Sequence, residues 1–588
     1  MKRKTDKSHE KFIETETGTI RKSWRERIKI ALVYPNRYQV GMSNLGFQTV
    51  YQMLNNIEYV VCERSFLPDD GGRLQQQITS IESGKPISDF DIIAFSVSFE
   101  NDFPNILAIL ARAGLPLQSN NRVDPHPLII AGGVACFLNP EPIAPFIDCF
   151  LIGEAETLLP QFVAHYYEIG FESNTNKKLP LISLAQNVPG TYVPAFYEAS
   201  YNTDGTLCFF QPVAEVPEKI ERNYVKDLSH VSTCSTLLTP HTTFDRTFLI
   251  EVARGCPHGC RFCSAGYIYR PPRFRPLSLL EECLEQGAGM SNKIGLMGAA
   301  VSDLPDIKAL CSQILQKDIR ISFSSLRADS LSSDLISVLK QSKIKTATIA
   351  PDAGSERMRR VINKGITEAN ILDAVETFVA NGIPNLKLYF MVGLPTETID
   401  DVEAVVKLCK KIKQQFLKSS RIKKRIGTIT VSLNSFVPKP FTPFQWFAMD
   451  EVKTLREKIK RIKDGLKGVA NVSVKANNLR WAQLQGLFSR GDRRVAQILS
   501  LANTAMGNWA KSLKNSTVDP DFYVYRERST DELLPWDFID HGIDKSFLKR
   551  EYNMAKQSKT SPPCSMESTC TICGVCRKDV EITEDNQK

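Results

Sequence analysis

Three cysteines lie in the run CPHGCRFC, at Cys256, Cys260 and Cys263, directly after an apolar stretch at residues 247–252. A [4Fe–4S] cluster ordinarily takes four cysteine thiolates, so a loop with three leaves one iron open for a substrate or cofactor. Two other interpretations stay open. The loop could be a zinc knuckle, with His258 as its one further ligand candidate, or it could hold buried thiols without a metal. A metal-binding loop directly after a strand constrains the fold, because it fixes the ligands at the end of that strand.

The length and the cysteine content set the class of protein. The chain has 588 residues, too many for a single core, and we expect about two to four domains. Fifteen cysteines in a large chain without a secretory signal favour metal or redox chemistry over disulfides. No window reaches the ~18 apolar residues of a membrane span. We therefore predict a cytoplasmic protein with no membrane partner.

The chain after the cysteine loop alternates strand and helix signals, as a parallel α/β barrel should. The predicted strands are residues 247–252, 293–298, 321–326, 346–352, 385–394 and 428–436. They predict a partial (β/α)6 barrel over residues 246–470. The chemistry of such folds lies at the carboxyl ends of the strands, where the cysteine loop also lies.

The spacing of the cysteines resembles that of the radical S-adenosylmethionine (SAM) superfamily. Three later segments resemble its barrel strand ends in the same order, namely IAPDAGSERMRRVINKG, LKLYFMVGLPTET and VSLNSFVPKPFTPFQW. The resemblance implies a [4Fe–4S] cluster on Cys256, Cys260 and Cys263 that reductively cleaves SAM to a 5′-deoxyadenosyl radical. It also implies a set of SAM-binding residues, which we take as Phe262, Arg327, Asp352, Gly354, Ser355 and Gly393.

Two positions depart from the family pattern. Where many members carry Gly-Gly-Glu after the second strand, this chain has Gly298-Ala299-Ala300, so the SAM ammonium group would need Ser302, Asp303 or backbone carbonyls. The family also more often has Glu where this chain has Asp352. We expect Arg327 to pair with the SAM carboxylate, because a guanidinium group can bind a carboxylate through two parallel hydrogen bonds.

The N-terminal third is predicted to be a separate α/β domain. After a polar tail at residues 1–26, short apolar strands at residues 28–34, 91–96, 127–132 and 149–152 predict a flavodoxin-like sheet over residues 27–175. The runs IIAGGVACFLNPEP and FIDCFLIGEAET resemble cobalamin-binding domains that precede radical SAM domains. The resemblance implies that cobalamin lies against Ser96, Ser98, Gly132 and Gly133. The Asp-x-His-x-x-Gly motif that supplies a histidine to cobalt is missing.

The remaining segments connect or follow these domains. Residues 176–245 are predicted to be a linker or small β insert, with a hairpin formed by YEASY and LCFFQPV. Residues 471–560 are predicted to be helical and to pack over the open side of the barrel. The tail at residues 561–588 holds Cys564, Cys570, Cys573 and Cys576, and Gly574 eases its tight turns. These four thiolates could complete a zinc site or a second iron–sulfur cluster.

The layout as a whole resembles an uncharacterised bacterial branch of radical SAM proteins with a cobalamin-binding-like N-terminal domain. We therefore expect a radical SAM enzyme with an unknown substrate and, if cobalamin binds, methylation of an unactivated carbon.

An RNA-base-modifying enzyme of the methylthiotransferase kind is the alternative, although the basic stretches at residues 410–425 and 453–467 are more typical of solvated helix faces than of nucleic-acid contacts. A zinc-stabilised binding protein is the alternative of another class. The expected electron donor is a flavodoxin or ferredoxin.

Overall fold

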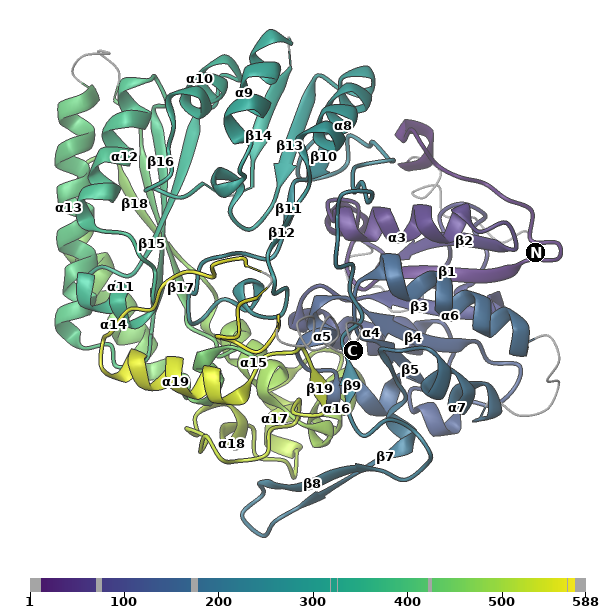
Figure 1. Ribbon diagram of the computed structural model, residues 1–588. Helices are drawn as coiled ribbons and strands as arrows, with labels where there is room; N and C mark the ends of the chain where they lie inside the picture. The colour runs from purple at the N-terminus through teal and green to yellow at the C-terminus, as the bar shows by residue number, and fades with distance from the viewer. Residues whose placement is uncertain are drawn as a thin grey trace, which may run out of the picture.

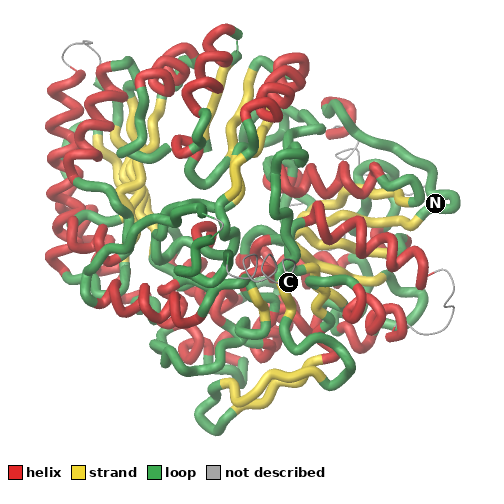
Figure 2. The backbone as a smooth tube through the Cα atoms, in the orientation of Figure 1, coloured by secondary structure: helices red, strands yellow, loops and turns green. Residues whose placement is uncertain are grey.

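Three larger β-sheets organise the described residues, a mostly parallel sheet of six strands in the N-terminal part and two parallel sheets in the centre (Figures 1 and 2). The structure is a computed structural model that describes residues 12–69, 77–170, 178–317, 319–324, 326–420, 426–567 and 569–576. The C-terminal helices lie below these sheets in the view of Figure 1. Within the described residues, no helix has the length and apolar character that a membrane crossing requires.

The N-terminal sheet has the strand order β2-β1-β3-β4-β5-β6. Its first five strands pair in parallel and β6 pairs antiparallel with β5. The order 2-1-3-4-5 is the doubly wound order of flavodoxin, so the predicted fold of this domain is confirmed. The strands are β1 (Ile28–Tyr34), β2 (Val60–Phe66), β3 (Ile92–Ser96), β4 (Leu128–Gly132), β5 (Cys149–Leu151) and β6 (Thr191–Tyr192).

Strand β2 is absent from the predicted set, because its sequence VVCERSF contains charged residues that suggest exposure. All of its residues are nevertheless buried. Arg64 forms buried ion pairs of 2.6 Å with Glu16 and with Glu82, and these offset the cost of removing its charge from water. Glu16 belongs to the segment predicted as a polar tail, so that segment contributes to the packed domain from residue 12 onward.

Helices cover both faces of the N-terminal sheet (Figure 1). Asn44 begins α3 by accepting a hydrogen bond from the backbone N–H of Phe47, and Pro104 occupies the first turn of α4, where a missing N–H costs nothing. The helices of this domain are α2 (Tyr38–Gly41), α3 (Leu45–Asn56), α4 (Phe103–Arg112), α5 (Val134–Leu138), α6 (Ala155–Gly170) and α7 (Lys178–Asn187).

The central strands form an open, partial barrel, as predicted. Strands β10, β13 and β14 make one parallel sheet, and β15 to β18 make another. Strand β18 lies beyond the predicted end of the barrel at residue 470 and extends the second sheet. The strands are β10 (Phe248–Glu251), β13 (Lys293–Met297), β14 (Arg320–Phe323), β15 (Thr346–Asp352), β16 (Asn385–Val392), β17 (Ile429–Ser435) and β18 (Val472–Ala476).

The helices between these strands lie on the outside of the barrel (Figure 1). Their apolar faces pack against the sheets, as the buried residues of α12 and α13 show. They are α8 (Leu277–Met290), α9 (Ile307–Gln316), α10 (Ser333–Gln341), α11 (Glu356–Val361), α12 (Glu368–Ala380), α13 (Ile399–Ser420) and α14 (Val452–Leu466).

The segment between the N-terminal sheet and the barrel forms the predicted hairpin from β7 (Tyr197–Tyr201) and β8 (Leu207–Pro212). It protrudes at the bottom of Figure 1. A further strand of this segment, β9 (Ile220–Glu221), pairs in parallel with β19 (Ile539–Asp540) from the C-terminal region. The linker and the C-terminal region are therefore joined by backbone hydrogen bonds.

The C-terminal helices pack against both domains. Helices α15 and α16 lie against the N-terminal domain, while α15 also contacts α14 and α19 contacts α11 of the barrel. A buried amide joins this region to the N-terminal domain, because Asn139 Nδ2 donates to the carbonyls of Ser489 (3.2 Å) and Gly491 (2.7 Å). The helices are α15 (Leu479–Arg490), α16 (Ala496–Thr504), α17 (Trp509–Asn515), α18 (Pro520–Val524) and α19 (Lys545–Lys556).

Replacement of Asn139 by Ala should therefore loosen the C-terminal region from the N-terminal domain. The variant leaves two buried carbonyls without their donor, and we expect a loss of about 2 kcal/mol in the free energy of unfolding. Urea denaturation followed by tryptophan fluorescence measures it. The exposed Asn121 supplies the matched control, and an equal loss in Asn121→Ala would contradict the role of Asn139.

Candidate functional site

A cavity of about 590 Å³ lies between the N-terminal sheet and the barrel sheet formed by β10, β13 and β14, at the carboxyl ends of their strands. One wall comes from the N-terminal domain and the other from the barrel and the segment that leads into the cysteine loop. Its lining is mainly apolar. The lining residues used below are Ser96, Ser98, Gly132, Gly133, Glu154, Glu156, Glu251, Arg254, Gly255, Ala265 and Gly298.

The wall formed by the N-terminal domain brings together the residues predicted to face cobalamin. Ser96 and Gly132 end the neighbouring strands β3 and β4, and Ser98 accepts a hydrogen bond of 3.0 Å from Asn44. Gly133 has φ +104°, and a Cβ there would lie 2.5 Å from the carbonyl oxygen of Val97. This glycine is therefore required by the fold itself.

Two further properties of this wall bear on a ligand. A Cβ on Gly132 would make only ordinary contacts, at 3.5 Å, so a side chain at that position is compatible with the backbone. Among the described residues that line the cavity there is no histidine. The wall thus offers small side chains and backbone to a flat ligand, and it offers no imidazole to a metal in that ligand.

The cysteine loop begins and ends on a short antiparallel pair, β11 (Ala253–Arg254) and β12 (Arg273–Phe274). The backbone of the loop is fixed at Gly259, whose carbonyl accepts hydrogen bonds from Tyr267 Oη (3.2 Å) and Asn363 Nδ2 (3.1 Å). Burial raises the pKa of Cys256 to about 11 and that of Cys260 to about 12. The free thiols are therefore protonated near neutrality, and binding of a metal must release these protons.

Charged side chains surround the loop in pairs. His258 Nε2 and Asp303 Oδ2 are 2.5 Å apart, so the histidine of the loop is engaged by a carboxylate. Lys364 Nζ donates to Asp352 Oδ2 at 2.6 Å, and burial raises the pKa of Asp352 although Lys364 opposes this effect. Asp352 also has φ +61°, a backbone conformation that costs free energy in any residue other than glycine.

Arg327 and two residues of the fourth-strand segment have partners within the protein. Arg327 forms a 2.9 Å ion pair with Asp329. A Cβ on Gly354 would lie 2.2 Å from the backbone nitrogen of Val405, so this glycine lets the turn after β15 approach α13. Ser355 caps α11. Their predicted contacts with SAM stay predictions.

The remaining two residues predicted to bind SAM lie in packed surroundings. Gly393 has φ +82°, and its N–H donates to Glu397 Oε2 at 2.8 Å. Phe262 is partly buried against the core that joins the N-terminal domain to the C-terminal helices. A contact of either residue with SAM also stays a prediction.

The tail cysteines lie next to the cysteine loop, a placement that the sequence did not indicate. The N–H of Cys564 donates to the carbonyl of Pro257 at 2.8 Å. Cys573 and Cys576 are buried, and Cys570 is partly exposed. Within the described residues, no three His, Cys, Asp or Glu side chains converge as a single metal ion requires.

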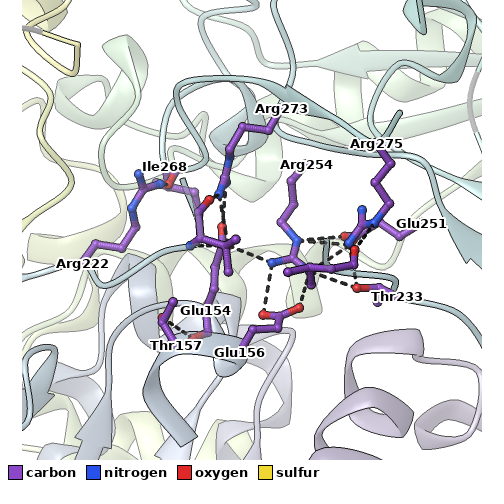
Figure 3. A network of polar contacts seen from close by, with 12 residues as sticks. Glu154, Glu156, Thr157, Arg222, Thr233, Glu251, Arg254, Ile268, Arg273 and Arg275 are labelled. Atoms are coloured by element: carbon purple, nitrogen blue, oxygen red, sulfur yellow. Dashed lines mark hydrogen bonds and ion pairs between the residues drawn. The ribbon is translucent and has the colours of Figure 1, made fainter. Parts of the chain in front are cut away.

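A network of buried charges crosses from the N-terminal domain to the barrel, along the edge of the cavity (Figure 3). Arg254, two residues before Cys256, forms ion pairs with Glu154 (2.8 Å) and Glu156 (2.5 Å) of the N-terminal domain. It also pairs with Glu251 at the end of β10 (2.9 Å). The sequence assigns no function to this network, because the pattern of a single sequence does not show which distant charges meet.

Two more arginines complete the network. Arg273 pairs with Glu154 at 2.7 Å, and Arg275 pairs with Glu251 at 2.8 Å. Burial alone would raise the pKa of Glu251, but Arg254 and Arg275 outweigh this effect and hold the pKa below its ordinary value. Glu251 is therefore ionised in the folded protein, and the carboxylates of the network are paired with guanidinium groups.

Replacement of Arg254 by Met should destabilise the protein strongly, because it leaves buried carboxylates without their central partner. We expect a loss of about 3 to 5 kcal/mol near neutral pH. The pKa of Glu251 is depressed in the folded state, so its stabilising contribution is present above the unfolded pKa of about 4.3 and is lost as the pH falls through the folded value. The difference between wild type and variant should accordingly narrow only as the pH is lowered below about 4.

Urea denaturation over a series of pH values measures this difference. Arg461→Met is the matched control, because Arg461 pairs with Glu403 at an exposed site and should contribute less than about 1 kcal/mol. A loss in Arg254→Met as small as that of the control would contradict the structural role of the network.

Comparisons with known proteins match two separate regions of the chain. Residues 46–194 match the model for radical SAM proteins, N-terminal, and residues 250–409 match that of the radical SAM superfamily. The uncharacterized protein MJ0966 of Methanocaldococcus jannaschii is 32% identical over 473 residues, which cover 80% of this chain and 90% of that protein.

Two further similarities are more distant. A tRNA-2-methylthio-N(6)-dimethylallyladenosine synthase of Chloroherpeton thalassium is 25% identical over 180 residues, 28% of this chain and 40% of that enzyme. The solved structure of the radical SAM methyltransferase TsrM from Kitasatospora setae, with cobalamin and a [4Fe–4S] cluster bound, has 12% identity and a TM-score of 0.48, covering 83% of this chain and 99% of that one. Neither similarity shows the substrate of this chain.

Proposed function

Because this chain belongs to the radical SAM superfamily of enzymes, we propose that Cys256, Cys260 and Cys263 hold a [4Fe–4S] cluster with one open iron for SAM. When bound, this cluster would supply the electron that cleaves SAM. The donor set fits a cluster, since each thiolate of a cluster binds a different iron. The three thiols are buried or partly buried, and they lie on a loop whose backbone is held by hydrogen bonds at Gly259.

The side chains around the loop are suited to binding and orienting SAM. Lys364 is a buried cation near Cys260, and its charge offsets that of the thiolates. Arg327 could turn from Asp329 to the SAM carboxylate, and Asp303 could accept from the SAM ammonium group while it holds His258. These are proposals for single residues, and they supply polar partners where the family's Gly-Gly-Glu is missing.

One observation supports a second cofactor, namely that a single cavity adjoins both the cysteine loop and the N-terminal sheet. Gly255 precedes Cys256, Ala265 follows Cys263 by two residues, and both line the same cavity as Ser96 and Gly132. A cavity of about 590 Å³ beyond the carboxyl ends of a flavodoxin-like sheet is the usual place and size for a cofactor. We propose that cobalamin binds there without a histidine on cobalt.

Cobalamin in this place would supply a transferable methyl group beside the site of SAM cleavage. The net reaction that fits best is therefore methylation of an unactivated carbon in an unknown substrate. The electron required for SAM cleavage would come from a donor of the flavodoxin or ferredoxin class, as we expect for this kind of enzyme.

Modification of an RNA base is the second candidate, and the similarity to a tRNA-methylthiolating enzyme favours it. The basic helices give little support to RNA binding, because some of their charges are paired within the protein. Lys458 of α14 is buried between Glu397 (2.9 Å) and Asp450 (2.7 Å), and Arg461 pairs with Glu403. Part of the positive charge that RNA would need is thus neutralised within the protein.

Replacement of Cys260 by Ala should abolish cleavage of SAM to 5′-deoxyadenosine, because the cluster loses a thiolate that it cannot replace. Liquid chromatography of the anaerobic reaction measures the product, and iron content and visible absorption report the cluster independently. Cys208→Ala, which removes an exposed thiol outside the loop, should leave all three unchanged. Undiminished cleavage by Cys260→Ala would refute the assignment.

Cobalamin binding is best tested at Gly132, because the backbone at Gly133 would itself be strained by a side chain. The reconstituted protein should retain hydroxocobalamin through gel filtration at about one equivalent, and Gly132→Trp should reduce this at least about tenfold by filling the cavity. Gly289→Trp on the exposed face of α8 is the control, since nothing lies within 4 Å of a Cβ there. If the wild type retains no cobalamin, the domain is a scaffold.

A further inference from the structure

We propose that Cys564, Cys570, Cys573 and Cys576 bind a second iron–sulfur cluster, held against the loop of the first, and that this second cluster passes electrons to the first. The sequence alone left zinc and an iron–sulfur cluster equally open. The relay rests on the proposed function of the cysteine loop, whereas the second metal site does not.

A buried cation without a carboxylate partner marks this site. The side chain of Arg270 lies between the cysteine loop and the tail, and the residue is 5% exposed. Its Nε donates to the carbonyl of Gly266 at 2.7 Å, and its guanidinium lies over the rings of Tyr267 and Phe547, 5.1 Å and 5.2 Å from their centroids. The thiols of Cys573 and Cys564 lie close enough to act on its charge. In the part of the chain that the structure describes, no Asp or Glu forms an ion pair with it. A buried charge of this kind needs compensation, and cysteine thiolates bound to metal would supply it.

The place of the tail favours a cluster over a zinc ion. The backbone of Cys564 is fastened to the loop that we propose holds the first cluster. A zinc ion has no redox chemistry, whereas an iron–sulfur cluster at this position can exchange electrons with the first. Gly574 lies in the tight turn between Cys573 and Cys576 and has φ +91°, a backbone conformation that favours glycine. A Cβ at this position would also lie 2.6 Å from the Asp544 carboxylate.

The tail is also fastened to the cysteine loop by its backbone. Cys564 donates to Pro257, which directly follows Cys256. Three residues earlier, the N–H of Ser561 donates to Asn363 Oδ1 at 2.9 Å, and the same Asn363 side chain donates to Gly259 within the loop. One amide therefore bridges the segments that carry the two sets of cysteines. In Figure 1 the yellow C-terminal segment runs directly beside the loop that follows β11.

The relay requires no chemistry beyond electron transfer. A reduced flavodoxin or ferredoxin gives one electron to the second cluster, which returns to its oxidised state when it gives that electron to the first. The first cluster is then reduced by one electron, the number that cleavage of one SAM consumes. Neither step makes or breaks a covalent bond of the protein.

The metal site is tested by replacing all four tail cysteines with Ala in the full chain. This is sharper than deleting the tail, because the backbone hydrogen bond from residue 564 to Pro257 is kept. Anaerobically reconstituted wild type should hold about eight irons and eight sulfides, and the tail variant and the Cys256/Cys260/Cys263→Ala variant about four each. Cys208→Ala is the control for iron bound to an exposed thiol.

Each result has one meaning. The second cluster would be overturned if the tail variant held as much iron as the wild type. It would also be overturned if the wild type held one zinc ion per chain and the tail variant held none. Unchanged iron in the loop variant would instead overturn the proposed function. Electron paramagnetic resonance of the reduced wild type should show spin coupling between neighbouring clusters. The coupling should vanish in the tail variant while the signal of the first cluster persists, which also shows that this variant folds.

The relay is tested by changing the reductant. Dithionite is small and can reduce the first cluster directly, so SAM cleavage by the tail variant should match the wild type with dithionite and fall at least about tenfold with reduced flavodoxin. Equal rates of the two proteins with flavodoxin would overturn the relay. Arg270→Gln should lower the midpoint potential of the second cluster, because a nearby positive charge favours the reduced state, and Arg270→Lys should restore it.

Discussion

The ion pairs of Arg254 are the interaction on which the arrangement of the N-terminal sheet and the barrel depends. Arg254 lies at the start of the cysteine loop, and its guanidinium group forms ion pairs with two carboxylates of the N-terminal domain, Glu154 and Glu156. Burial of these charged side chains costs desolvation free energy, which their ion pairs offset. A different docking of the two domains would leave the charges buried and unpaired, so the ion pairs restrict how the domains can meet. Cys256, the first cysteine of the loop, is thereby placed at a fixed position relative to the N-terminal sheet.

The docking makes the carboxyl ends of two parallel sheets face one another. In a doubly wound sheet the ligand crevice lies beyond these ends, and in a barrel the chemistry lies at the same ends. A single cavity can therefore serve both domains without a separate channel between them. The small residues at the strand ends, among them Gly132 and Gly298, keep this space open.

Much of the fold could be predicted from the sequence, because most strands are short apolar runs with clear boundaries. Strand β2 was missed because Arg64 looks exposed until its partners, one of them 48 residues away, are known. The cysteine loop could be predicted from its spacing. The glycines of the barrel motifs were recognised as a pattern, but Gly354 and Gly393 serve helix packing in this structure, a role that a motif does not reveal. The charge network and the position of the tail depend on contacts between distant segments, which no local pattern encodes.

The hydrogen bond from Cys564 to Pro257 has a consequence for how the protein matures in the cell. Translation delivers Pro257 and its neighbouring cysteines long before Cys564 leaves the ribosome, and domains generally fold as they emerge. The loop must therefore spend the interval without the segment that later lies against it. If the loop holds the proposed cluster, iron and sulfide can be delivered to it before the later segment arrives. The order of synthesis would then separate metal loading from the packing of the tail against the loop.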